Sequence, residues 1–214
     1  MNFAYSSQEL DAIERLISSD RLSRYNLLAA GDRTATIKHY EYNTRLSEAF
    51  YTPLQGLEIC LRNSLSLELT ALLGVTWYDN AHGVFQHPVA EMIVNAQHSL
   101  IQEGKLVVAS RMIAELNFGF WVSILGPRYD STLWVPALRK AFPHRPHGQE
   151  RNAVHKAVNA IRRLRNRVAH HEPILHRKLD EDHDLVLKLI SWCCPNTSTW
   201  VTVQSRLPAV LAGK

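Results

Sequence analysis

The residues best suited to chemistry lie in one short stretch, residues 161–174, which reads I-R-R-L-R-N-R-V-A-H-H-E-P-I. An arginine stays charged and can hold two phosphate oxygens at once. A histidine can transfer protons near neutral pH, and a neighbouring amide can orient it. Cleavage of RNA by its own 2′-hydroxyl requires removal of a proton, stabilisation of phosphate charge and protonation of the leaving oxygen. The residue types in this stretch could therefore support cleavage of RNA.

A helical projection of residues 149–170 divides these side chains between two faces. Arg165 flanks the apolar face, which is expected to pack on the core and consists of Val154, Ala157, Val158, Ile161, Leu164 and Val168. The opposite face carries the polar side chains Asn166, His170, Arg162, Arg163 and Arg167. The helix thus presents a cationic, hydrogen-bonding face that its own core does not need.

Positive charge is concentrated around the same stretch. Residues 139–178 contain eleven Lys or Arg and two acids, an excess of nine, whereas the whole chain carries only +4. Six of the eleven histidines lie there as well. A localised basic patch favours a phosphate-rich partner such as RNA, although a solvated helix surface would have the same composition.

Three short motifs resemble one known family. Residues 165–170, R-N-R-V-A-H, are similar to the R-x(4–6)-H signature of the HEPN superfamily, and R-N-R-V-A-H-H resembles the helix end of its abortive-infection (Abi-like) branch. Upstream, L-E-I-C-L-R-N at residues 57–63 and F-G-F-W at residues 118–121 also look like that branch. The resemblance covers roughly residues 40 to 180 and is specific only when the three motifs are combined.

The resemblance implies a helical bundle that forms a homodimer and cleaves RNA without a metal or other cofactor, in phage defence or as a toxin. It assigns the catalytic roles to Arg165, Asn166 and His170, and Glu58 with Arg62 would position Arg165 or the dimer partner. Further RNA contacts are expected from Arg162, Arg163, Arg167 and His171. An antitoxin or other regulatory partner is also implied. Some HEPN toxins have a modified tyrosine where this chain has Glu172, so control by that route is not expected.

Several alternatives stay open at this point. Arg163 projects nearer to His170 than Arg165 does and also satisfies the family spacing. His170 could simply stabilise the end of a helix through the helix dipole. Glu58 and Arg62, four residues apart, could form a surface ion pair. The chain could therefore be a non-catalytic HEPN module that binds RNA or a protein, or a purely structural helical protein.

The periodicity of apolar residues predicts an all-α fold and a single domain, 1–214, with an N-terminal helical extension, 1–31, and a C-terminal tail, 195–214. The strongest run follows Leu46 to Leu72, and Pro53 is expected to kink it or to divide it near Thr52. Other helices are predicted at residues 7–18 (capped by Ser7), 20–30, 33–51, 89–102, 107–125, 130–142, 149–170 and 180–192, with a small terminal helix pair at 195–211.

Composition limits the function classes further. Apolar residues make up 46% of the chain, which suits a packed core, and no stretch approaches the roughly 20 apolar residues that cross a bilayer. The odd count of three cysteines and the lack of a signal-like N-terminal segment favour a reduced, cytoplasmic protein with no membrane partner. His170, His171 and His176 have no helical metal-ligand spacing, and no metal is expected. The aromatic residues of 118–121 could stack on bases but are more typical of a core.

Overall fold

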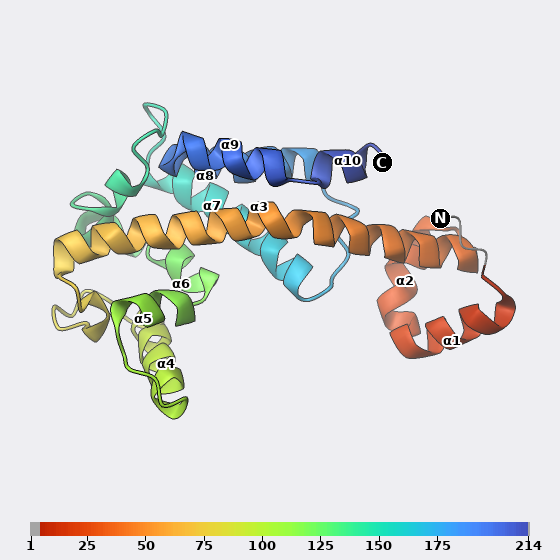
Figure 1. Cartoon of the computed structure of the whole chain (residues 1–214), viewed down its shortest axis with the longest axis horizontal. Coiled ribbons are helices and arrows are strands. Elements are labelled where there is room, and N and C mark those ends of the chain that lie inside the picture. The colour runs from red at the N-terminus through yellow and green to blue at the C-terminus, as the bar shows by residue number, and fades with distance from the viewer. Residues whose placement is uncertain (1–4, 214) are drawn as a thin grey trace.

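The computed structural model describes residues 5–213, and every regular element within this range is a helix. The all-α prediction is therefore confirmed. None of the helices among these residues is long and apolar enough to cross a membrane. One long helix, α3 (Arg33–Leu73), runs through the molecule, and the other helices pack along it and at its two ends (Figure 1).

Pro53 is expected either to kink α3 or to divide it near Thr52. The helix is continuous, so the division is wrong. Figure 1 shows its ribbon running unbroken. Pro53 lies inside this helix and is buried. A proline inside a helix costs about 3 kcal/mol, because it removes one backbone donor and crowds the preceding turn. The leucine stripe on both sides of Pro53 is fully buried from Leu46 to Leu69, and burial of each such side chain recovers about 2 kcal/mol. Leu72, which was included in the predicted stripe, is 38% exposed.

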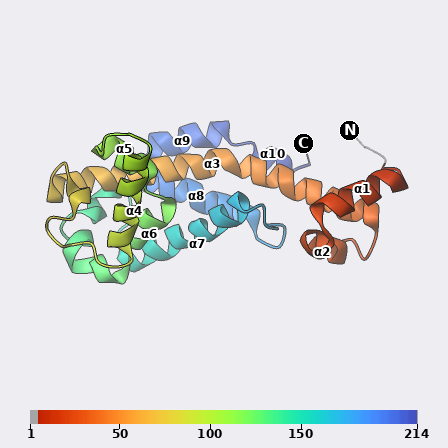
Figure 2. The same cartoon turned by 90° about the horizontal axis from the view of Figure 1, so that it is seen from below.

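The C-terminal helices cover one side of α3. Helices α7 (Arg151–Ala169) and α8 (Leu179–Cys193) pack beside it, followed by α9 (Pro195–Gln204) and α10 (Leu207–Leu211) (Figure 2). The predicted terminal helix pair is thus present. Helix α9 comes close to α3 at Gly56, where an added Cβ atom would lie 2.7 Å from Cγ2 of Val201. The glycine therefore sets how near α9 can come to α3.

The predicted helix over residues 107–125 is wrong in one respect: it is two helices, α5 (Ala109–Glu115) and α6 (Phe118–Ser123). Leu116 is extended, and Asn117 starts α6 by accepting a hydrogen bond at Oδ1 from the Phe120 amide at 3.1 Å. A Cβ atom at Gly119 would lie 2.9 Å from the same Oδ1. The glycine leaves room for the cap of a new helix. The aromatic residues of this segment are buried, which confirms that they belong to the core.

The segment between α6 and α7 also differs from the prediction of one helix over 130–142. It forms a π-helical turn at Asp130–Trp134 and a 3-10 turn at Leu138–Ala141. Pro136 lacks a backbone donor, which prevents a regular helix from continuing between the two turns. Further 3-10 turns occur at Trp77–Asp79, before α4 (Val89–Gln102), and at Pro127–Tyr129, after α6.

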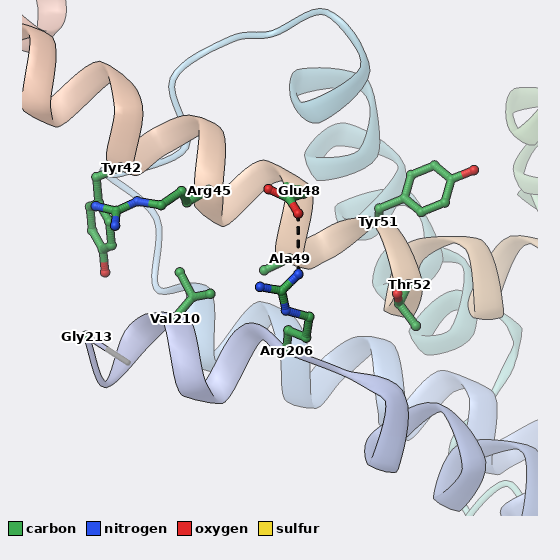
Figure 3. Close-up of a pocket in the computed structure, with 9 residues that line it drawn as sticks. All are labelled: Tyr42, Arg45, Glu48, Ala49, Tyr51, Thr52, Arg206, Val210 and Gly213. Atoms are coloured by element: carbon green, nitrogen blue, oxygen red, sulfur yellow. Dashed lines mark hydrogen bonds and ion pairs between the residues drawn. The ribbon is translucent and has the colours of Figure 1, made fainter. Parts of the chain in front are cut away.

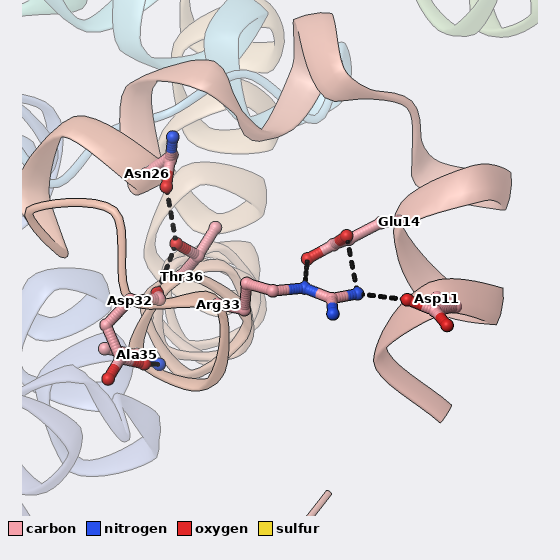
Figure 4. Close-up of polar contacts among 7 residues, drawn as sticks. All are labelled: Asp11, Glu14, Asn26, Asp32, Arg33, Ala35 and Thr36. Atoms are coloured by element: carbon pink, nitrogen blue, oxygen red, sulfur yellow. Dashed lines mark hydrogen bonds and ion pairs between the residues drawn. The ribbon is translucent and has the colours of Figure 1, made fainter. Parts of the chain in front are cut away.

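The N-terminal hairpin has a small core of its own. Helices α1 (Ser7–Ile17) and α2 (Ser19–Leu28) pack on the start of α3 through Leu10, Leu22, Tyr25 and Ile37. Ser6, not the predicted Ser7, caps α1 in a reciprocal capping box with Glu9. Arg33 at the start of α3 donates to Glu14 at 2.9 Å and to Asp11 of α1, as Figure 4 shows.

We expect Gly56→Ala to lower the free energy of unfolding by about 1–3 kcal/mol, because the new methyl group collides with a fully buried Val201. At an open helical position the same change would raise stability by about 0.5–1 kcal/mol. Urea denaturation of Gly56→Ala, Val201→Ala and the double variant measures the effect. Additive losses in the double variant would contradict it, because the smaller side chain at 201 should relieve the collision.

Candidate functional site

The Arg165 side chain contacts α3 and is partly exposed to solvent. It lies one turn after the buried Ile161 on α7, and its Nε donates to Oε2 of Glu58 at 3.3 Å. The Arg165 side chain is 39% exposed and that of Glu58 is 23% exposed, so the ion pair sits at the edge of the core and not beneath it. Glu58 thus fixes Arg165 on the side of α7 that faces the long helix.

A groove with a volume of about 710 Å³ opens beside this ion pair, between the middle of α3 and the end of α7. Its charged residues include Arg62 on α3 as well as Glu58 and Arg165. Nε of Arg62 is buried and has no hydrogen-bond partner among residues 5–213. The walls also include Thr44, Ser47, Glu48, Tyr51, Leu54, Gln55, Ile59, Val168, Ala169 and His171. The predicted residues Arg165, Glu58 and Arg62 are therefore brought together.

The two histidines at the end of α7 are placed differently. His170 is the exposed C-terminal cap residue and does not line the groove, nor does Asn166. His171 lines the groove and adopts a left-handed conformation with φ of 57°. The Glu172 amide bonds the Arg167 carbonyl at 2.8 Å, and the His171 amide bonds that of Val168 at 3.1 Å. This is the pattern of a Schellman motif, in which the left-handed position is usually glycine.

The loop after α7 is held by contacts from distant parts of the chain. Buried Asn43 on α3 accepts a hydrogen bond from the Ile174 amide at 2.7 Å, and Arg21 on α2 donates to the His171 carbonyl at 2.9 Å. We did not predict either contact from sequence. The available signal was an amide at position 43, one turn before Leu46 in the register of the leucine stripe.

The remaining predicted RNA-binding arginines do not gather at the groove. Arg167 holds the loop, since its Nε donates to the Pro173 carbonyl at 3.1 Å and its Nη1 lies 3.4 Å from Glu172. Arg162 donates to Asn159 on its own helix at 2.9 Å. Arg163 is exposed and makes no hydrogen bond or ion pair with the described part of the chain. Of the two candidate phosphate-binding arginines, only Arg165 faces the groove.

The positive field along α7 affects nearby histidines. The pKa of His155 is lowered first by partial burial and then by Arg151 and Arg162. Beyond the helix, the pKa of His176 is lowered by burial and then by Arg167, Arg24 and Arg177. Such a field attracts anionic groups.

Within residues 5–213, no group of three or more His, Cys, Asp or Glu side chains is arranged to hold a metal ion. No protein-family model matches the chain, and no curated protein or solved structure is significantly similar to it.

We expect His171→Gly to raise the free energy of unfolding by about 1 kcal/mol, because glycine adopts a left-handed conformation without steric cost. The neighbouring His170→Gly is the matched control, since φ there is −94° and glycine only adds flexibility to the unfolded chain. Thermal and urea denaturation compare the two variants. If both lost stability equally, the cap geometry at His171 would be wrong.

Proposed function

We propose that the protein is a metal-independent endoribonuclease of the HEPN type, with an Abi-like helical bundle. One observation carries the proposal: a single groove holds Arg165, Arg62 and His171 between α3 and the end of α7. Two arginine side chains in one groove suit an RNA phosphate, and an imidazole beside them can transfer protons. The motif of residues 165–171, which resembles the HEPN signature, supplies two of these three groups.

In the proposed reaction the 2′-oxygen of a ribose attacks the adjacent phosphorus atom. A base removes the 2′-hydroxyl proton as the new oxygen–phosphorus bond forms, and an acid protonates the 5′-oxygen as its bond to phosphorus breaks. The products carry a 2′,3′-cyclic phosphate and a 5′-hydroxyl. Arg165 stabilises the negative charge on the phosphate oxygens in the transition state. Glu58 acts through Arg165 as a positioning residue, because it holds the guanidinium at Nε and leaves the other nitrogens for phosphate.

A homodimer completes the proposed site. Acid and base act on opposite sides of the phosphate, whereas one chain offers the histidines of only one helix end. A second copy related by a two-fold axis would bring another His170 and His171. His171 faces the groove of its own chain, and His170 is exposed at the end of α7, where it is available to a facing subunit. We assign the phosphate-binding role to Arg165 and proton transfer to this pair of histidines, with Asn166 orienting His170.

The proposed setting is phage defence or toxin activity in the cytoplasm, under the control of an antitoxin or other regulatory partner. The three cysteines are unpaired, which suits a reducing compartment.

The alternative is a non-catalytic HEPN module that binds RNA or a protein. The observation in its favour is that several motif residues have structural partners: Arg165 pairs with Glu58, Arg167 holds the loop, and His171 belongs to the helix cap. A binding module would show RNA affinity that falls with salt and would generate no new RNA ends.

Arg165→Ala should reduce the cleavage rate at least about 100-fold, because a charge-stabilising group is lost from the transition state. His170→Ala and His171→Ala should each fold and dimerise, and loss of one proton carrier should slow cleavage about 100-fold or more. Cleavage of labelled RNA in EDTA is followed on gels, and the 2′,3′-cyclic phosphate end is identified by mass spectrometry. Arg111→Ala, an exposed arginine on α5, is the control for loss of charge.

Two results would contradict the proposal. One is RNA that stays intact in EDTA but is cut when a divalent metal is added. The other is a loss of cleavage in Arg163→Ala that exceeds the loss in Arg165→Ala, which would place the phosphate away from the groove.

A further inference from the structure

A second cavity adjoins the groove along α3. It has a volume of about 490 Å³ and lies between α3 and α10 (Figure 3). Glu48 and Tyr51 line both cavities, so one ridge of α3 separates them. Tyr51 precedes Glu58 by seven residues, which is two helical turns or about 10 Å along the axis. The second cavity is thus a direct extension of the groove.

The second cavity contains two arginines and two tyrosines. The Arg45 guanidinium lies 5.6 Å from the centre of the Tyr42 ring. Arg206, at the start of α10, reaches α3 and donates to Glu48 at 3.5 Å, as Figure 3 shows. The side chains of Arg206 and Glu48 are 77% and 68% exposed, so their pairing contributes little to stability and is easily exchanged for another anion.

We propose that this second cavity binds single-stranded RNA next to the cleaved phosphate, as an extension of the substrate site. The inference rests on the proposed function for the identity of its ligand. Arg45 and Arg206 would hold phosphates, and Tyr51, which is 65% exposed on the ridge, would stack on a base between the two cavities. Charged, aromatic and hydroxyl side chains make up most of the lining, whereas only Ala49 and Val210 are aliphatic. This lining suits a polyanion with planar bases better than an apolar peptide helix.

Binding of labelled oligouridylates, about four and about sixteen nucleotides long, tests the extension by fluorescence anisotropy at several salt concentrations. Arg45→Ser/Arg206→Ser is the main variant, because neither residue lines the groove at Arg165. Its affinity for the long RNA should fall about 10-fold, and the slope of log affinity against log salt should decrease by about 1.4 for two lost phosphate contacts. The loss for the short RNA should be smaller. Arg111→Ser is the matched control and should leave the salt slope unchanged.

Two single variants separate stacking from charge. Tyr51→Ser should weaken binding of the long RNA about 5-fold or more while the salt slope stays the same. Glu48→Gln should strengthen binding roughly two- to five-fold, because it frees Arg206 and removes a negative charge from both cavities. Misfolding is not expected to raise affinity while the protein still cleaves RNA, so this variant tests the site even if the double arginine variant is unstable.

The inference is overturned if the double arginine variant behaves like Arg111→Ser while the wild-type protein binds and cleaves RNA, and the proposed function then stands alone. It is upheld, and the proposed catalysis fails, if the variants change RNA binding as expected but the wild-type protein never cleaves RNA. If the wild-type protein binds neither the short nor the long RNA, the inference is overturned. This outcome includes the case in which the cavity binds a protein partner instead.

Discussion

Burial of one face of α3 is the constraint on which the rest of the structure depends. Its leucines from Leu46 to Leu69 contact the helices that follow in the sequence. One wall of the groove is therefore α3 itself, and the other is held in place by packing against α3. The same packing keeps the helix continuous through Pro53. A division at this proline would have separated Glu48 and Tyr51 from Glu58 and Arg62, and all four residues line the groove.

The buried face of α3 positions the C-terminal helices, and its partly exposed face positions a charged residue of the groove. Toward the core, Gly56 admits α9 to close contact, which brings the C-terminal helices down onto α3. Toward the groove, Glu58 carries a partly buried carboxylate that needs a cation nearby. Arg165 on α7 supplies this cation, and its ion pair with Glu58 restricts the direction of the guanidinium. Packing thereby turns an arginine of an ordinary basic helix into a fixed cation beside an open groove.

The end of α7 combines strain with support. His171 takes a backbone conformation that favours glycine, yet Asn43, Arg21 and Arg167 hold the loop around it. A strained residue persists when its surroundings fix it, and such residues are concentrated at functional sites. Here the strained conformation directs a histidine toward the groove rather than continuing the helix. For this reason the proposed role in proton transfer includes His171, in the groove, together with His170.

The sequence by itself determined the helical fold class, most helix positions and the basic stretch that contains Arg165 and His171. These features are local, because apolar spacing and helix stop signals act over a few residues. The helix start at Asn117 and the irregular turns near Pro136 were not located, since a short cap or an irregular turn can replace a helix without changing the apolar pattern. Only the tertiary structure decided that Arg165 faces Glu58, that Asn43 holds Ile174, and that a second basic cavity adjoins the groove. These contacts join residues far apart in sequence, and they depend on how whole helices pack.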